Sequence, residues 1–417
     1  MASSIPPVTL AAMRLYEERT PSELTLPAAP PTSGSADQID IPYDHYVIER
    51  SGQPRALFVL PWLDGGGAEN AALDLARGLT SQGWRIDVAT SDPSTNRHLG
   101  DALSFAGTVW AADDLVPEGM QSEWIARCGA RGAYDLVHVS NSRPGFDALP
   151  SVAKAAKRPL IAVHLHAEEE MGRGYPVYCA ARCGRVADLF VVHSRVMEAT
   201  VTSYGVDASK VLVLPVPRES GAIAERSSEV VRHPPRAPRL LYAGRMEPEK
   251  NPIAAIEAVR TLRDQNVEAT LTLAGSGSLL QDVQRHLAAT NSSAFILPVG
   301  HMVNMADVYA EHDVVVLPSH REGTPLVVIE AFAAGLPVVA TDVGAVHECV
   351  HGALGVVIAA NSPEALAQGI GTVLQDTRYW RKEACDDRRR VAEAHLPGAV
   401  GRFYDSALRR LSASETP

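Results

Sequence analysis

Short apolar segments alternate with amphipathic ones along most of this chain. The first group starts with the apolar run ALFVLP (56–61), passes through a glycine-rich turn into AENAALDLARGLTSQG (68–83), and ends with WRIDVAT (84–90). Apolar residues in the middle segment recur at the i, i+3, i+4 and i+7 spacing that lines one face of a helix. These residues are Ala72, Leu75, Ala76 and Leu79. The pattern predicts a strand, a helix and a second strand, which together form a βαβ unit.

The same alternation continues in two series separated by a polar stretch. Short apolar runs that alternate with helical segments predict a doubly wound parallel sheet in each series, because parallel strands need crossover helices that bury both faces. The later runs of the first series are DLVHVS (135–140), PLIAVHLH (159–166), DLFVVHS (188–194) and KVLVLPVP (210–217). Those of the second series are RLLYAG (239–244), EATLTLAG (268–275), AFILPVG (294–300), DVVVLPS (313–319), LPVVAT (336–341) and GVVIAA (355–360).

Length and composition divide the chain into five parts. A chain of 417 residues exceeds the size at which one hydrophobic core usually stops growing, so two globular domains are expected. Residues 1–53 form a Pro/Ser-rich extension that cannot build a packed core. We expect α/β domains at 54–218 and 238–396, an interdomain linker at 219–237, and a C-terminal helix at 397–417 that returns to the first domain. Two such domains in tandem form a cleft at the carboxyl ends of their strands, where ligands bind.

Charge, cysteine usage and hydropathy narrow the class of protein. The formal net charge of −11 argues against a nucleic-acid partner, because affinity for nucleic acid comes from many Lys and Arg contacts to phosphates. The five cysteines include no CxxC pair, which favours a reduced, intracellular chain. The start MASSIPPVTL lacks the features of a signal peptide, and no apolar run is long enough to span a bilayer. We therefore expect a cytoplasmic protein, and peripheral contact with the cytoplasmic face of a membrane stays open.

The segment EGTPLVVIE (322–330) follows the apolar run DVVVLPS. Thr324 suits the N-cap and Pro325 the first position of a helix, whose N–H groups would point at the end of the preceding strand and attract phosphate. Glu322 then lies in the loop, and Glu330 lies about one and a half turns inside the helix. The residues alone leave two interpretations open: carboxylates that bind different parts of one extended ligand, or an acidic loop residue and a solvated helical glutamate.

A second candidate feature is the segment YAGRMEPEKNP (242–252), in which Arg245 and Lys250 flank a loop. Asn251 as N-cap and Pro252 predict the start of a helix directly after this loop. Two cations at the carboxyl end of a strand could neutralise a diphosphate leaving group without a metal. Taken as bare residues, two surface cations are the simpler interpretation.

Two features of the first domain are weaker. The glycines of Gly65–Gly67 could let a backbone loop close over a ligand, or they could form only a flexible turn. In VHLHAEE, alternation places His164 and His166 on the same face of a strand, so one could be buried structurally while the other reaches the cleft. Neither histidine belongs to a recognisable set of metal ligands, and we expect no metal.

Taken together, these segments resemble the family 4 retaining glycosyltransferases of GT-B fold over roughly residues 56 to 415. The matching motifs are E-x7-E with its following E-A-x-A-x-G-x-P-V-V-A-T, GRxxxxK, and G-G-A-E after the first strand. The chain reads EGTP where many relatives read EGFG, and PVPRE (215–219) where N-G-V-D is usual.

The resemblance implies a role for each matching residue. Glu330 would bind the donor ribose hydroxyls, and Glu322 would lie beside the hydroxyls of the transferred sugar. Arg245 and Lys250 would hold the donor diphosphate. His166 would approach the reacting centre, and it is preferred to the other histidine because the strand end runs one residue longer than in common relatives. The other donor-binding residues implied are Gly66, Gly67, Gly275, His301, Gly323, Thr324 and Pro325.

The implied reaction transfers a sugar from a nucleoside-diphosphate donor, held by 238–396, to an acceptor hydroxyl on the side of 54–218, with retention of configuration. The donor is a substrate, and no cofactor or metal is implied. The acceptor would be a glycan, a glycolipid or a small molecule. Two alternatives remain: a nucleotide-sugar epimerase or glycosyl phosphorylase of GT-B fold, or an inactive scaffold subunit. The intact acidic and basic motif residues favour catalysis.

Overall fold

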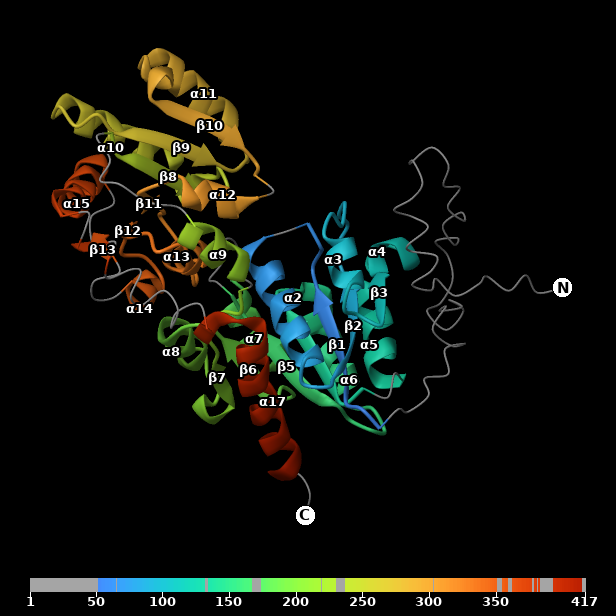
Figure 1. Ribbon diagram of the computed structural model, residues 1–417. Helices are drawn as coiled ribbons and strands as arrows, with labels where there is room; N and C mark the ends of the chain where they lie inside the picture. The colour runs from blue at the N-terminus through green and yellow to red at the C-terminus, as the bar shows by residue number, and fades with distance from the viewer. Residues whose placement is uncertain are drawn as a thin grey trace. The chain divides into compact units, whose positions relative to one another are not determined.

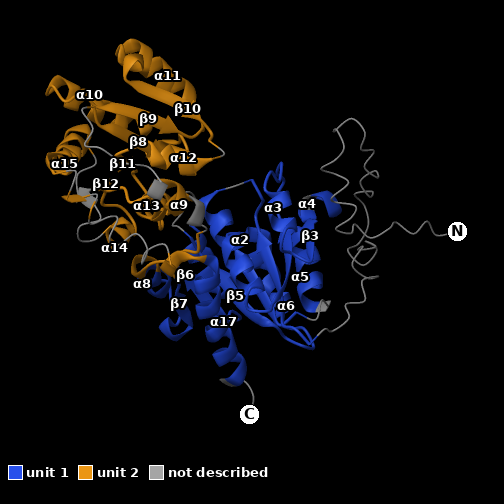
Figure 2. Cartoon of the chain, in the orientation of Figure 1, with its two compact units in different colours: residues 1–192, 198–214, 397–417 blue, residues 193–197, 215–396 orange. Residues whose placement is uncertain are grey.

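The computed structural model describes residues 52–414 except 65, 132–133, 167–173, 219, 230–236, 303, 351–354, 359–361, 377–378, 381 and 383–392. The expected N-terminal extension, apart from its last two residues, lies outside the described residues. The chain divides into two compact units (Figure 2). Unit 1 comprises the residues up to Val192, Glu198–Leu214 and Pro397–Pro417, and unit 2 comprises His193–Met197 and Pro215–Leu396.

Unit 1 is built on a seven-stranded sheet whose neighbouring strands pair in parallel. The strand order is β3-β2-β1-β4-β5-β6-β7, so the chain starts near the middle, builds one edge and then crosses back to build the other (Figure 1). β1 and β4 are buried at every position, as parallel strands covered on both faces should be. The strands are β1 (Arg55–Leu60), β2 (Arg85–Thr90), β3 (Thr108–Ala111), β4 (Leu136–Ser140), β5 (Leu160–His164), β6 (Leu189–Val192) and β7 (Val211–Val213).

Helices connect these strands. The predicted apolar stripe of α2 is confirmed, because all four of its residues belong to one buried cluster with side chains of β1. The helices that follow these strands are α2 (Gly67–Thr80), α3 (Leu99–Leu103), α4 (Ala112–Leu115), α5 (Gln121–Arg131), α6 (Arg143–Val152), α7 (Tyr175–Cys183), α8 (Arg195–Ser203) and the 3-10 turn η4 (Ala208–Lys210). The last helix of the chain is α17 (Pro397–Ser414).

The strand β3 was not among the strands expected from the sequence. It has only four residues, TVWA, and it pairs with β2 alone, at the edge of the sheet. Four residues are the lower limit for a strand, and only Val109 and Trp110 of this run are large apolar residues, so its pattern gives a weak signal. Its pairing partner, rather than its own sequence, makes it a strand.

Unit 2 is built on a six-stranded parallel sheet with the order β10-β9-β8-β11-β12-β13. Its strands are β8 (Arg239–Ala243), β9 (Thr270–Ala274), β10 (Ile296–Gly300), β11 (Val314–Leu317), β12 (Val338–Thr341) and β13 (Gly355–Ile358). Its helices and 3-10 turns are α9 (Gly221–Glu229), η5 (Pro248–Lys250), α10 (Pro252–Asp264), α11 (Leu280–Ala289), η6 (Ser292–Ala294), α12 (Met305–Ala310), α13 (Leu326–Ala333), α14 (Val346–Cys349) and α15 (Pro363–Gln375). The predicted fold class, two doubly wound parallel-sheet domains, is confirmed.

The chain passes from unit 1 to unit 2 between Leu214 and Pro215, a few residues before the boundary expected at 218. The residues expected to form a linker, 219–237, include α9, which belongs to unit 2 and packs against α12 and α13. The sequence of α9 is mostly polar, so its composition resembled that of a linker. Within the described residues, no helix is both long and apolar enough to cross a membrane.

In unit 1, α17 packs against α2 at a close approach of two glycines. A Cβ on Gly401 would lie 2.4 Å from the carbonyl carbon and oxygen of Gly78, and a Cβ on Gly78 would lie 2.1 Å from the carbonyl oxygen of Pro397. Real Cβ atoms do not approach backbone atoms so closely, so both positions require glycine. Trp84 Nε1 donates to Asp405 Oδ1 at 2.7 Å and adds a polar contact to the same helix.

Replacing Gly401 by alanine should therefore destabilise unit 1. The added methyl must push α17 away from α2, and overpacking of this kind costs about 1–3 kcal/mol of unfolding free energy. The matched control is Gly371→Ala in α15, where a Cβ would meet nothing within 4 Å. That control should be neutral or stabilising by about 0.5–1 kcal/mol, because alanine favours a helix interior. Urea unfolding followed by circular dichroism measures both, and equal effects of the two variants would refute the close approach.

Candidate active site

Loops at the carboxyl ends of three neighbouring strands of unit 2 carry most of the predicted site residues. β8 leads into Arg245 and η5, β9 leads into the turn at Gly275, and β11 leads into the segment 318–325. β8 pairs in parallel with β9 on one side and with β11 on the other. Because the carboxyl ends of parallel neighbours lie at one edge of a sheet, segments far apart in the sequence meet there.

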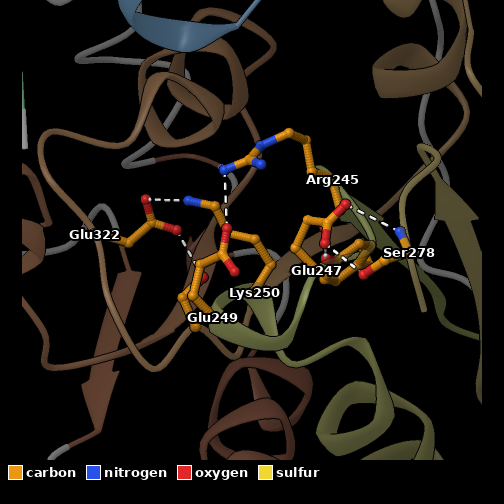
Figure 3. A network of polar contacts seen from close by, with 8 residues as sticks. Arg245, Glu247, Glu249, Lys250, Ser278 and Glu322 are labelled. Carbon is orange, nitrogen blue, oxygen red and sulfur yellow. Dashed lines mark hydrogen bonds and ion pairs between the residues drawn. The ribbon is translucent and has the colours of Figure 1, made fainter. Parts of the chain in front are cut away.

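Lys250 and Glu322 form an ion pair at this edge, as Figure 3 shows. Lys250 Nζ lies 2.7 Å from Glu322 Oε2. Ser319 Oγ donates to Glu322 Oε1 at 2.6 Å. The side chain of Glu322 is 6% exposed and that of Lys250 is 22% exposed. A shielded carboxylate needs a positive or hydrogen-bonding partner, and it has one of each here. Lys250 is thus a half-buried cation with a defined partner rather than a solvated surface cation.

Arg245 is the exposed cation of the predicted pair. Its NH2 lies 2.8 Å from Glu249 Oε1, and its side chain is 63% exposed. Its main chain is held by Tyr242, whose hydroxyl donates to the Arg245 carbonyl oxygen at 2.6 Å. Burial, with the Glu322 carboxylate nearby, raises the pKa of Tyr242 well above its usual range, so this hydroxyl remains a donor. Arg245 therefore has a fixed backbone and a guanidinium that faces solvent.

A third contact in Figure 3 joins the loops after β8 and β9. Glu247 accepts a hydrogen bond from Ser278 Oγ at 2.5 Å and another from the Ser278 N–H at 2.9 Å. These two hydrogen bonds lower the pKa of Glu247, because they favour its charged form. Glu247 was not among the predicted residues, and it ties the loop of Arg245 to the loop that follows Gly275.

Glycines let the loops approach one another closely. Gly275 has φ +146°, and a Cβ there would lie 1.8 Å from the carbonyl oxygen of Gly244. Gly344 has φ +56°, and a Cβ there would lie 1.8 Å from the carbonyl oxygen of Glu322. The predicted Gly275 thus has a structural reason to be glycine. Gly344 was missed, although a glycine so soon after strand β12 was a usable signal.

The helix α13 begins one residue later than the sequence predicted. Pro325 is the N-cap, with φ −75° and ψ 112°, and Leu326 is the first helical residue, so the expected N-cap at Thr324 and first helical position at Pro325 are wrong. Proline fixes φ, but it leaves ψ free to stay extended, and that is the geometry of an N-cap. Gly323 and Thr324 are half-buried in the loop before it, where the Gly323 carbonyl accepts the N–H of Ala345 at 3.2 Å.

Glu330 is buried inside α13 and makes two side-chain contacts. Tyr309 donates its hydroxyl to Glu330 Oε2 at 2.7 Å, and Arg218 Nε donates to Glu330 Oε1 at 2.7 Å. The residue is 8% exposed. The interpretation of Glu330 as a solvated helical glutamate is therefore wrong. Arg218 and Tyr309 were not among the predicted residues.

In unit 1, the glycine turn after β1 leads directly into α2. Gly66 is the N-cap, and Gly67 is already helical, so the helix opens one residue before the expected Ala68. A Cβ on Gly66 would lie 2.2 Å from Glu69 Oε2, because the buried Glu69 side chain folds back over the helix start. Gly65 lies outside the described residues.

The two histidines at the end of β5 differ in environment. His164 is fully buried, and its Nδ1 lies 3.0 Å from His138 Nε2, while His138 Nδ1 lies 2.8 Å from the hydroxyl of Tyr404 on α17. His166 is half-buried, and its Nε2 lies 2.9 Å from Ser140 Oγ. His164 is thus the internal member of the pair, and the role of His166 stays a prediction. His301 is exposed, directly after β10.

Comparison with known proteins places both units in one family. Residues 65–218 match the model described as Glycosyltransferase Family 4, and residues 237–376 match the model described as Glycosyl transferases group 1. The chain is 32% identical over 330 residues to a glycogen synthase of Mycobacterium tuberculosis, which covers 75% of this chain and 76% of that protein. It is also 32% identical over 187 residues to a D-inositol 3-phosphate glycosyltransferase of Mycolicibacterium gilvum, covering 44% of this chain and 42% of that one. The solved structure of Anabaena HepE in complex with UDP-glucose has a TM-score of 0.68 at 18% identity and covers 85% of this chain and 99% of that chain.

Replacing Gly344 by alanine should disrupt the loop that carries Glu322. A residue with a side chain at this φ costs about 1–2 kcal/mol, and the clash with the Glu322 carbonyl adds to it. The control is Gly300→Ala, because Gly300 also has a positive φ, +72°, but a Cβ there meets nothing within 4 Å. Gly344→Ala should lower the urea midpoint clearly more than Gly300→Ala does. If the two variants unfold at the same midpoint, the close approach of these two loops is not a constraint.

Proposed function

This chain belongs to glycosyltransferase family 4, and from that membership we propose that it transfers a sugar from a nucleoside-diphosphate donor to an acceptor hydroxyl with retention of configuration. The chain is a glycosyltransferase of GT-B fold, related to enzymes of polysaccharide and glycan synthesis. Beyond family membership, we propose which residues bind the donor, that configuration is retained, and that no metal ion takes part. We also propose that the protein is cytoplasmic and that its acceptor is a glycan, a glycolipid or a small molecule.

The observation that carries the proposal is that two cations, each paired with a carboxylate, meet at the carboxyl edge of the unit 2 sheet. Lys250 is paired with Glu322, and Arg245 reaches into solvent from the same loop. A diphosphate bound at this edge would accept charge-assisted hydrogen bonds from both cations. Positive groups fixed where negative charge develops stabilise a departing diphosphate more than they stabilise the intact donor.

The two cations would act differently on the diphosphate. The ammonium of Lys250 has three N–H donors, so it can keep its bond to Glu322 and give another to a phosphate oxygen. Its position is therefore set before the donor binds. The guanidinium of Arg245 would have to exchange Glu249 for the phosphate, since Glu249 is its carboxylate partner. Lys250 would provide fixed positive charge, and Arg245 would close on the bound donor.

Transfer with retention requires that the acceptor attack the same face of the sugar from which the diphosphate leaves. In the proposed step the bond from the anomeric carbon to the diphosphate oxygen breaks, and a bond from that carbon to the acceptor oxygen forms. The proton of the acceptor hydroxyl passes to the departing diphosphate oxygen. No protein nucleophile takes part. Glu322, already paired with Lys250 and Ser319, would contact the hydroxyls of the transferred sugar instead.

The base of the donor is proposed from the comparison structure alone. HepE was solved with UDP-glucose, so UDP-sugars are the first donors to test, followed by GDP- and ADP-sugars. Donors that bind the native state raise the unfolding midpoint, by about 2.7 kcal/mol of stability at a hundredfold excess over Kd. A thermal-shift panel of UDP-, GDP- and ADP-glucose therefore identifies the base. If none of these donors shifts the midpoint or releases its nucleoside diphosphate, the proposal of a nucleotide-sugar donor is wrong.

Arg245→Gln should lower both donor affinity and turnover. A hydrogen bond to a charged group is worth about 1.5–3 kcal/mol, so a loss of about tenfold to a hundredfold is expected. The fold should be unaffected, because the Arg245 side chain is largely exposed and its ion pair is local. The control is Arg285→Gln, which removes another exposed arginine of unit 2 that is paired only three residues away along α11. Release of UDP from UDP-glucose measures turnover, and an unchanged rate in Arg245→Gln would remove this residue from the diphosphate site.

Mass spectrometry of the intact protein tests the proposed absence of a protein nucleophile. When the native protein turns over UDP-glucose, no species heavier by one glycosyl unit should accumulate. The product should keep the anomeric configuration of the donor, as read from the proton coupling at the anomeric carbon. An adduct that forms on the native protein and is lost in Glu322→Gln would contradict the same-face reaction and make Glu322 the nucleophile.

A further inference from the structure

Arg218 lies in the segment PVPRE (215–219), where the chain enters unit 2 after Leu214. Its guanidinium approaches one oxygen of Glu330 with two nitrogens: Nε donates to Oε1 at 2.7 Å, and NH2 forms an ion pair with the same atom. The side chain of Glu330 is 10% exposed and that of Arg218 is 23% exposed. A buried carboxylate of this kind requires a positive partner, and Arg218 is that partner.

The main chain at Arg218 is anchored by two hydrogen bonds with His395. Its N–H donates to the carbonyl oxygen of His395 at 2.7 Å, and His395 Nδ1 lies 2.7 Å from the carbonyl oxygen of Val216. Burial lowers the pKa of His395, so its ring is neutral near pH 7, and Nδ1 carries the hydrogen that Val216 accepts. Arg218 is therefore fixed against the segment that precedes the return of the chain to unit 1 after Leu396.

The second oxygen of Glu330 has its own donor. The hydroxyl of Tyr309 donates to Oε2 at 2.7 Å, and Tyr309 is completely buried. Burial and the adjacent carboxylate raise the pKa of Tyr309 well above its usual range, so the hydroxyl keeps its proton and always donates. Arg218 contacts one oxygen and Tyr309 the other, so both oxygens are held and the plane of the carboxylate is fixed.

We propose that Arg218 is a positioning residue that orients the Glu330 carboxylate toward the two ribose hydroxyls of the donor. The oriented carboxylate thereby selects ribonucleotides over 2′-deoxyribonucleotides. This inference rests on the proposed function, which places the ribose at Glu330. An ionised carboxylate offers about four acceptor positions, so it can accept hydroxyl hydrogens in addition to its two protein partners. A site that hydrogen-bonds a hydroxyl discriminates against the analogue that lacks it, because its polar group is then left unpaired.

Binding of UDP and of 2′-deoxy-UDP, measured by isothermal titration calorimetry, tests the inference. The native protein should bind UDP about tenfold or more tightly than 2′-deoxy-UDP, since about 1.4 kcal/mol corresponds to a factor of ten. Arg218→Gln should weaken UDP binding and bring the ratio of the two dissociation constants close to one. Arg218→Lys keeps the charge and should restore part of the ratio. A role limited to folding would weaken both ligands equally and leave the ratio unchanged.

The matched control is Arg226→Gln. Arg226 lies on α9, and its Nε donates to Asp307 Oδ1 at 2.5 Å. Asp307 belongs to α12, the helix that carries Tyr309, yet both members of this pair are about half exposed. Arg226→Gln should therefore keep the native ratio. If Arg218→Gln does not fold, as judged by circular dichroism, Arg218→Lys carries the test, because the loss of the two-nitrogen contact should still lower the ratio.

The outcomes separate the inference from the function on which it rests. An unchanged ratio in a folded Arg218 variant, a native protein that binds the two ligands equally, or tighter UDP binding in Arg218→Gln overturns the role of Arg218 while the glycosyltransferase proposal stands. If the native protein binds none of UDP, GDP and ADP, the nucleotide-sugar donor itself is wrong, and the inference is overturned with it.

Discussion

The ion pair between Lys250 and Glu322 is the contact on which the site in unit 2 depends. It joins the loop after β8 to the loop after β11, two strands that pair directly although 72 residues separate the two side chains. Both residues are largely shielded, so neither charge is tolerable without the other. The backbone supports the same junction, because the N–H of His320 donates to the carbonyl oxygen of Glu249 at 2.8 Å. The sheet brings the loops together, and the ion pair fixes how they meet.

Much of the fold could be predicted because parallel strands are buried on both faces and therefore appear as short, continuous apolar runs. The sequence of β11, VVVL, is enough by itself to identify this segment as a strand. The errors occurred where tertiary contacts decide the structure. β3 is a strand because β2 offers it an edge, and α9 is a helix because α12 and α13 cover one of its sides. The start of α13 was missed by one residue, because the extended ψ of Pro325 cannot be deduced from its fixed φ.

The candidate site was predictable in part for a similar reason. Arg245, Lys250 and Glu322 follow strands of one sheet, and sequence motifs are enough to place them at a common edge. The sequence around Glu330 does indicate that this residue is buried. It is the only charged residue in LVVIEAFA, and a helix that is apolar on all sides is buried, so its single carboxylate had to find a partner. The identity of that partner could not be predicted, since Arg218 lies 112 residues away in the sequence.

The cations of the candidate site differ in exposure, and this difference decides which of them can exchange its carboxylate for another anion. Each of these three cations already forms an ion pair with a carboxylate. Lys250 pairs with Glu322, Arg245 with Glu249, and Arg218 with Glu330. In a chain of net charge −11, this edge is locally close to neutral rather than strongly basic. In the proposed function, long-range attraction of the anionic donor would then be weak, and its affinity would come from contacts made after it arrives. Only an exposed cation can exchange a carboxylate for a phosphate at little cost, since a buried one would leave its partner unpaired. Arg245 is the exposed cation, whereas Lys250 and Arg218 are more shielded and, in the proposed function, would keep their carboxylates and hold the geometry of the donor site.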